Sequence, residues 1–163
     1  MPQPDPHAHC GFCGARVPAG LGWPRTCPAC ANTSYRNPLP VAVAVVPVAG
    51  GGLLAVRRAI APVGLALPGG FVELGESWQG AAARELAEET GVRADPDAIR
   101  ELRVLSAPDG TLLVFGAVPE IGREALAAFA PSPEVSAVEV LAAPSPDVVF
   151  PLHAQVIAEV LGT

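Results

Sequence analysis

The sequence predicts an α/β (α+β) layer fold with a small cysteine-rich segment ahead of it. Apolar runs of strand length alternate with stretches of helical pattern from about residue 41 to residue 161. All four cysteines lie within the first thirty residues. Between these parts, residues 32–40 (NTSYRNPLP) read as a connector that contains proline and asparagine. We therefore expect two domains, residues 1–37 and 38–163.

The elements of the larger domain are predicted from apolar runs and turn residues. The expected strands are residues 41–48, 53–58, 65–67, 71–73, 102–105, 111–118 and 135–141. The glycines at 50–52 favour a hairpin between the first two strands. The expected helices are residues 78–90, 123–129 and 152–161, the first of them capped by Ser77 and stopped by Gly91. The expected arrangement is a mixed β-sheet between helices.

Composition and charge exclude several classes of protein. The chain is 50% hydrophobic and 16% charged, which is enough to bury a core. The most apolar run, residues 41–56, is interrupted by Pro47 and three glycines, so we expect no membrane span. The first residues lack the basic and apolar regions of a signal peptide, and a cytoplasmic protein is expected. The net charge of −6 argues against non-specific binding of nucleic acid.

The cysteines form two C-x2-C pairs, CGFC and CPAC. The pairs are Cys10 with Cys13 and Cys27 with Cys30. Each pair can hold one metal ion from a tight turn, and thiolates favour tetrahedral zinc. Gly14 follows the first pair, where such a turn often needs a positive φ. Two disulfides or four free thiols are the alternatives, and a reducing compartment disfavours disulfides.

A zinc ion bound by four cysteines would be structural. Its coordination sphere is complete, so no position is open for catalysis. His7 and His9 lie nearby but are not needed as ligands. The segment is too short to build a core of its own, so the metal would fold it.

A second cluster of candidate ligands lies in ARELAEETG, residues 83–91. On a helical wheel of about 100° per residue, Glu85, Glu88 and Glu89 share one face. Three carboxylates on one face suit a hard divalent cation, which prefers oxygen ligands. The alternative is an ordinary solvated acidic face with Arg84 as its partner.

The surrounding residues resemble the signature of the Nudix hydrolases, G-x5-E-x7-R-E-U-x-E-E-x-G-U with U aliphatic. Gly70, Glu76 and the run from Arg84 to Val92 match every fixed position. The resemblance covers about residues 41–161 and implies the Nudix fold. It also implies hydrolysis of a pyrophosphate bond in a nucleoside diphosphate linked to another group, with Mg²⁺ or Mn²⁺.

Roles follow from the resemblance by position. It implies that Glu85 and Glu89 are the main magnesium ligands and that Glu88 is a further ligand or positions water. Arg84 and Glu76 brace this face, and the carbonyl of Gly70 is a further metal ligand. Water would attack phosphorus while the metal neutralises the phosphate charge.

Further candidates lie outside the signature. Gly69 and Gly70 permit close approach of the backbone to phosphates. Phe71, Tyr35 and Trp78 can each stack on a base, and the alternative for each is a place in the core. Arg57 and Arg58 point to alternate faces of their strand, so only one is expected to reach the substrate; the alternative for each is a surface salt bridge. Glu120 and Glu134 are the candidates for an extra catalytic carboxylate, and either is otherwise a surface residue.

A four-cysteine ribbon before a Nudix domain is similar to the NADH pyrophosphatase branch, which includes enzymes acting on NAD-capped RNA. The motif S-Q-P-W-P-F-P-x-S of that branch is absent from residues 106–111 (SAPDGT). NADH, NAD, ADP-ribose, another dinucleotide and nucleoside triphosphates therefore stay open as substrates. We expect one of these nucleotides as the substrate and a second copy of the chain as the partner in a homodimer. The one nucleic acid we expect as a partner is capped RNA, as a substrate. The competing hypothesis is a zinc-ribbon module that binds RNA or protein on an inactive Nudix fold.

Overall fold

The computed structural model describes residues 5–162 of the chain. The chain forms two compact units, Met1–Pro38 and Leu39–Thr163. None of the helices between residues 5 and 162 has the length and apolar character that a membrane crossing needs.

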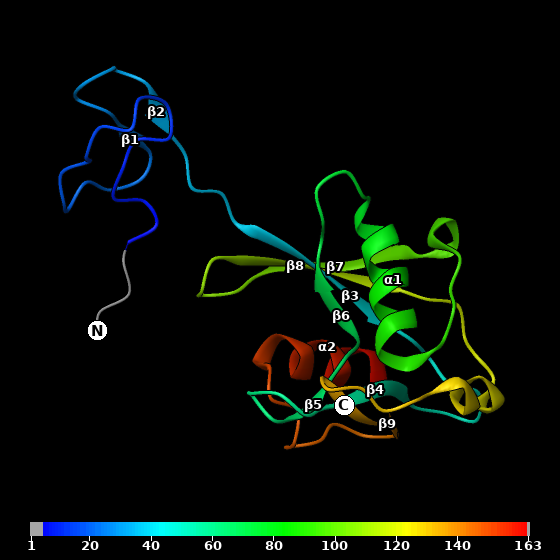
Figure 1. Cartoon of the computed structure of the whole chain (residues 1–163). Coiled ribbons are helices and arrows are strands. Elements are labelled where there is room, and N and C mark those ends of the chain that lie inside the picture. Colours follow the sequence, from blue (N-terminus) through cyan, green and yellow to red (C-terminus); the bar gives the residue numbers. More distant parts are fainter. Residues whose placement is uncertain (1–4, 163) are drawn as a thin grey trace. The chain divides into compact units, whose positions relative to one another are not determined.

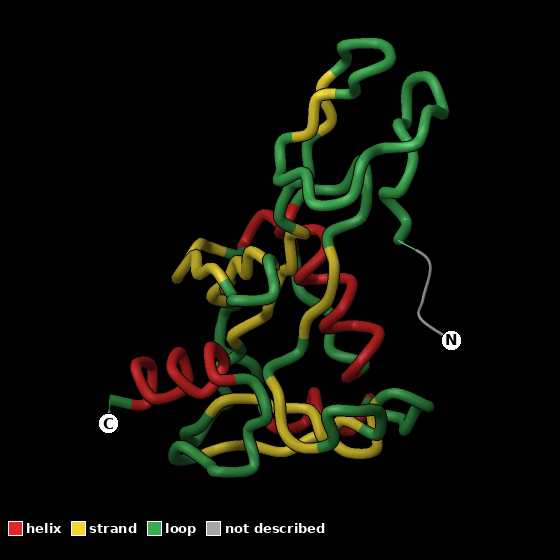
Figure 2. The backbone as a smooth tube through the Cα atoms, turned by 90° about the vertical axis from the view of Figure 1, so that its left-hand side faces the viewer, coloured by secondary structure: helices red, strands yellow, loops and turns green. Residues whose placement is uncertain are grey.

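The first unit consists mainly of loops and turns (Figure 2). Its two short strands, β1 (Arg25–Thr26) and β2 (Thr33–Ser34), pair in antiparallel fashion. The two cysteine turns repeat one pattern of hydrogen bonds, in which the carbonyl of Cys10 accepts from Gly14 and that of Cys27 accepts from Ala31, each at 2.9 Å. Gly14 has the expected positive φ of 72°, and Ala31 takes the equivalent position at 58°.

The second unit contains two β-sheets (Figure 1). The four-stranded sheet has the order β6-β3-β8-β7 and is mixed, because β3 and β8 run parallel. The three-stranded sheet has the order β5-β4-β9 and is antiparallel. The strands are β3 (Leu39–Val45), β4 (Leu53–Arg58), β5 (Gly64–Ala66), β6 (Gly69–Phe71), β7 (Arg100–Ser106), β8 (Thr111–Ala117) and β9 (Val135–Leu141).

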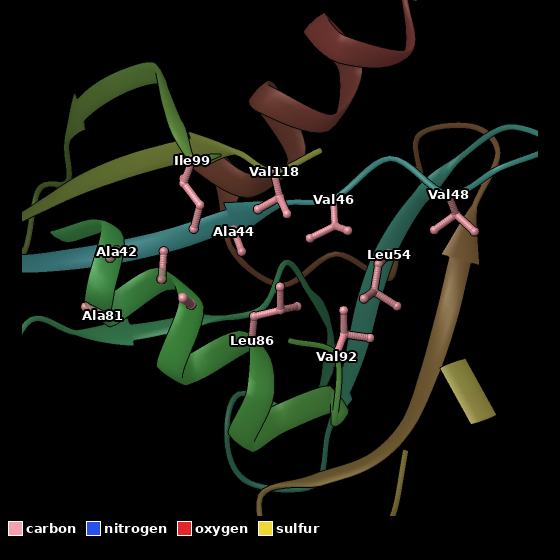
Figure 3. Close-up of a cluster of buried hydrophobic side chains, with 12 residues drawn as sticks. Ala42, Ala44, Val46, Val48, Leu54, Ala81, Leu86, Val92, Ile99 and Val118 are labelled. Atoms are coloured by element: carbon pink, nitrogen blue, oxygen red, sulfur yellow. The ribbon is translucent and has the colours of Figure 1, made fainter. Parts of the chain in front are cut away.

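Two α-helices and two 3-10 helices complete this unit. They are α1 (Trp78–Thr90), η1 (Pro96–Ala98), η2 (Arg123–Ala128) and α2 (Pro151–Leu161). Alternate residues of β3 serve two different cores, since successive side chains of a strand point to opposite faces. Ala42 and Ala44 pack with Leu86 of α1, as Figure 3 shows. Val43 and Val45 belong to the cluster that contains Val156 and Ile157 of α2. The predicted mixed sheet with helices is confirmed.

The predicted hairpin between residues 41–48 and 53–58 forms only at its turn and does not continue into a ladder. β3 and β4 belong to different sheets, and the antiparallel pairing between them is confined to the turn, where Pro47 bridges Leu53 and the Leu54 N–H donates to the carbonyl of Val46 at 2.9 Å. Pro47 has no backbone N–H to continue a ladder, and the three glycines that follow take positive φ angles. Two apolar strands in sequence predict proximity, but the choice of partner depends on β8 and β9, which come much later in the chain.

The region around Pro68 also differs from the expectation. Gly69 and Gly70, predicted as a turn before a strand at 71–73, are themselves paired in β6 with Val43 and Ala42. A side chain on Gly69 would run into the backbone carbonyl of Ala42, so glycine is required here for close approach of the strands. The predicted helix at 123–129 is a 3-10 helix.

Candidate functional site

Helix α1 carries the candidate site and is firmly fixed at both ends. The Ser77 hydroxyl accepts a hydrogen bond from the Gly80 N–H at 3.0 Å. Gly91 ends the helix with a φ of 76°, and its N–H donates to the carbonyl of Ala87. Alanines 81–83, Leu86 and Thr90 form the buried face. The three glutamates therefore lie on the other side, towards solvent and β6.

Arg84 is the cation that holds this acidic face together. Its guanidinium donates to Glu76 at 2.8 and 3.3 Å, to Glu85 at 2.7 Å and to Glu88 at 3.3 Å. It also donates to the carbonyl of Phe71 at 3.1 Å. These bonds raise the pKa of Arg84, and the bond from Arg84 lowers the pKa of Glu76. One arginine thus ties the helix to β6 and to the loop that precedes the helix.

Glu89 differs from its neighbours because it has no ion-pair partner among residues 5–162. Its Oε2 accepts a hydrogen bond from the Gly69 N–H at 3.0 Å. Burial raises the pKa of Glu89 to about 7, and the charges of Glu85 and Glu134 act in the same direction. The Gly69 bond and the charge of Arg58 act against this rise. A cation beside Glu89 would relieve this cost, as expected of a metal ligand.

Glu85 lies directly against β6. A side chain on Gly70 would collide with the Glu85 carboxylate. Only glycine at this position leaves the carboxylate where it is, half-buried beside Arg84 and close to Glu89. The signature glycine and glutamate, fifteen positions apart in the sequence, are therefore neighbours in space.

The carboxylate oxygens of Glu85, Glu88 and Glu89 do not all lie as close together as the ligands of one metal ion would. Within residues 5–162 the four cysteines are the one group of three or more such ligands whose atoms all lie within 4.8 Å of one another. Glu88 is the outlying member, 60% exposed and turned to Arg84. Glu85 and Glu89 are the half-buried pair that faces β6.

The structure distinguishes the two candidate arginines. Arg57 forms an ion pair with Glu139 at 2.6 Å and lies 3.9 Å from Asp147, so it is a salt-bridge residue on the second sheet. Arg58 forms no ion pair among the described residues. Its guanidinium lies over the ring of Phe150 and donates to the carbonyl of Pro62, and its charge acts on Glu89. Of the two, Arg58 is therefore the one whose charge acts on Glu89.

The candidate extra carboxylates also separate. Both are exposed. Glu134 acts electrostatically on Glu89, and its carbonyl accepts a hydrogen bond from Ala59, next to Arg58. Glu120 is not among the charges that act on Glu89. Phe71, at 57% exposure on β6, leaves its ring open to solvent.

The four cysteines meet in the first unit, and none forms a disulfide. The Cys10 and Cys30 sulfurs lie 3.8 Å apart, and those of Cys13 and Cys27 lie 3.7 Å apart. A tetrahedron with zinc–sulfur bonds of about 2.3 Å has edges of about 3.8 Å, so the spacing fits zinc. Backbone N–H groups favour the thiolate: they lower the pKa of Cys10, and the Asn32 N–H lowers that of Cys30 to about 6.

One residue beside the site has no sequence signal. His153 of α2 is buried, and its Nδ1 accepts a hydrogen bond from the Leu67 N–H at 3.1 Å. Burial lowers the pKa of His153 to about 4, so the ring is neutral at pH 7. The bond holds the chain two residues before Gly69. In the sequence, His153 is one of three polar residues in a mostly apolar helix, and nothing there indicates its partner.

Comparisons with known proteins agree with this architecture. The family model for the NUDIX domain matches residues 38–157. The NAD-capped RNA hydrolase NudC of Stutzerimonas stutzeri is 36% identical over 91 residues, which cover 55% of this chain and 33% of that protein. The NudC of Citrobacter koseri is 32% identical over 88 residues, 53% of this chain and 34% of that protein. The chain thus matches about a third of the length of these curated relatives.

Solved structures extend the likeness to most of the chain. A NUDIX hydrolase from Nitrosomonas europaea is 28% identical with a TM-score of 0.71, and the match covers 94% of this chain and 90% of that one. A bifunctional NMN adenylyltransferase/ADP ribose pyrophosphatase from Francisella tularensis is 26% identical with a TM-score of 0.58, over 78% of this chain and 42% of that one. The chain therefore belongs to the NUDIX family of hydrolases.

Proposed function

We propose that the chain is a metal-dependent nucleotide pyrophosphohydrolase whose site lies between α1 and β6. The observation that carries the proposal is the position of Glu85 and Glu89 against the two glycines of β6. The Glu85 carboxylate occupies the space that a side chain on Gly70 would need. Glu89 accepts a hydrogen bond from the Gly69 N–H, and its burial, without a paired cation between residues 5 and 162, raises its pKa. A solvated acidic face would need neither close packing nor burial.

The carboxylates fit a hard divalent cation, because they offer oxygen ligands at a place where positive charge is missing. Mg²⁺ or Mn²⁺, held by Glu85, Glu89 and Glu88, would neutralise the pyrophosphate and activate the attacking water. The raised pKa of Glu89 suits a group that takes a proton near neutral pH. Arg84 fixes the position of α1 relative to Glu76 and β6 through its hydrogen bonds to Glu76 and to the carbonyl of Phe71. Arg58 and Glu134 also act electrostatically on the Glu89 carboxylate: the charge of Arg58 lowers its pKa and the charge of Glu134 raises it.

The substrate class is a nucleoside diphosphate linked to another group. The matched relatives are named for NAD-capped RNA hydrolysis, and one structural neighbour is named for ADP-ribose pyrophosphatase activity. These names support dinucleotide-like substrates. Because residues 106–111 lack the branch motif, the proposal includes NADH, NAD and ADP-ribose alike. We assign this reaction to residues 38–163 and a structural zinc to residues 1–37.

The test is a panel of substrates with and without Mg²⁺. The panel comprises NADH, NAD, ADP-ribose, FAD, diadenosine polyphosphates and deoxynucleoside triphosphates. We expect metal-dependent release of mononucleotide from at least one linked nucleoside diphosphate, measured by chromatography of the products. No hydrolysis of any member with Mg²⁺ or Mn²⁺ would favour the binding-module hypothesis.

A further inference from the structure

The first unit differs in charge from the unit that contains the candidate hydrolytic site. The whole chain is acidic, but its charge is divided unevenly. Residues 1–38 contain three arginines and one aspartate, whereas residues 39–163 contain seven arginines and fifteen acidic residues. The first unit therefore has a formal charge of +2 and the second −8. A polyanion is attracted to the first unit and repelled by the second.

The arginines of the first unit are not neutralised. In residues 5–38 the structure records no salt bridge to any of them. Arg25 is the one held in place: its guanidinium donates to the carbonyls of Leu21 and His7 and lies 4.4 Å from the centre of the Trp23 ring. Arg25 is thus a fixed positive charge stacked on an aromatic face.

A hollow of about 210 Å³ opens beside this pair. Trp23, Arg25, Tyr35 and His9 are among the residues that line it. The ring of His7 stands edge-on to Trp23 at 5.0 Å and so supports the wall of the hollow. Tyr35 is 71% exposed, and its ring therefore remains available to a ligand. A second exposed ring, Phe12 at 63%, belongs to the same unit.

Flat rings beside fixed positive charge match the chemistry of one class of ligand. Each base of a single strand has an aromatic face that can stack, and each link carries a negative phosphate. A duplex hides its base faces, and an acidic peptide offers charge without rings. We propose that the first unit binds single-stranded nucleic acid, with a base stacked on Tyr35 and the backbone beside Arg25. This inference goes beyond the proposed hydrolysis and does not depend on it.

Binding is measured with the full chain, zinc present, and a labelled 5′-hydroxyl oligonucleotide. Such a strand has no pyrophosphate bond, so the hydrolytic reaction does not contribute. Fluorescence anisotropy should show binding of single-stranded RNA or DNA, compared in separate arms, that weakens with salt and exceeds binding of the matching duplex. Equal binding of single strand and duplex, or none at low salt, would overturn the proposal. Displacement by polyglutamate as effective as by unlabelled single strand would assign the surface to acidic peptides and overturn it as well.

Four variants separate stacking from charge. Tyr35→Ala should weaken binding about five-fold or more, because one stacked base is lost, whereas Tyr35→Phe should bind like the wild type. Arg36 is the exposed arginine that follows Tyr35 in the chain, so Arg36→Gln should weaken binding and reduce the dependence of the affinity on salt. Arg93→Gln, an equal change of charge on an exposed residue of the second unit, should do neither. Tyr35→Ala with wild-type affinity, or Arg93→Gln as damaging as Arg36→Gln, would contradict the assignment.

Discussion

At the scale of single residues, the position of the Glu85 carboxylate depends on the absence of a side chain at Gly70. The missing side chain of Gly70 is the space that the Glu85 carboxylate occupies. The signature motif could be recognised in the sequence, and it names both residues. Their contact could not be predicted, because it depends on β6 pairing with β3 and on α1 packing against that sheet.

A methyl group at this position should therefore disable the site. We expect Gly70→Ala to reduce turnover by one or more orders of magnitude, because Glu85 must move away from Glu89. Gly22→Ala is the matched control, since its methyl group meets nothing within 4 Å. Steady-state kinetics of both variants test this, and wild-type turnover of Gly70→Ala would show that Glu85 can shift without consequence.

The buried His153 leads to a prediction about how the free energy of unfolding depends on pH. Its folded pKa of about 4 lies below the ordinary 6.5, so the unfolded chain takes up a proton first as the pH falls. The stability it contributes is fully present above pH 6.5 and is lost between pH 6.5 and pH 4. The loss is on the order of 3 kcal/mol.

Urea unfolding of the wild type and of His153→Gln at several pH values checks this. The difference between the two free energies of unfolding should be constant above pH 6.5 and shrink on acidification. Glu89, whose raised pKa acts in the opposite direction, is common to both proteins and cancels. A difference that stays constant from pH 7.5 to pH 4.5 would contradict the buried neutral histidine.

At the scale of elements, local signals located most strands and both α-helices. Ser77 and Gly91 predicted the ends of α1 correctly, because caps act within a few residues. Pairing was predicted less well. The hairpin is limited to its turn because β3 and β4 form their ladders with β8 and β9, and no local residue specifies such partners. Glu134, for example, is brought to the carboxyl end of β4, where its carbonyl accepts from Ala59, only through the pairing of β9 with β4.

The cysteine turns of the first unit are the element that a metal should hold. Cys27→Ser removes one thiolate, so we expect loss of about one bound zinc and a lower melting temperature. Metal analysis and thermal unfolding measure both, with Ser34→Ala as a control that keeps all four thiols. If the variant kept zinc and fold but lost turnover, the ribbon would have a catalytic role.

At the scale of the whole molecule, the two units carry opposite net charge, and each proposed function involves an anionic ligand. The first unit is basic and the second acidic, yet the acidic site is proposed to act on an anion. The proposed reaction therefore requires a cation between Glu89 and the pyrophosphate. The sequence predicted this from three clustered glutamates, and the structure adds that Glu89 is the member held without an ion pair in the described chain.

Glu89→Gln is the most direct test of the metal site. At pH 8, above its raised pKa, Glu89 is charged and destabilises the metal-free fold, so the neutral amide should leave the melting temperature equal or higher. Mg²⁺ should raise the melting temperature of the wild type, and of the control Glu101→Gln, more than that of Glu89→Gln. Turnover of Glu89→Gln should fall by orders of magnitude. Wild-type turnover, with an unchanged response to Mg²⁺, would contradict the metal-site assignment.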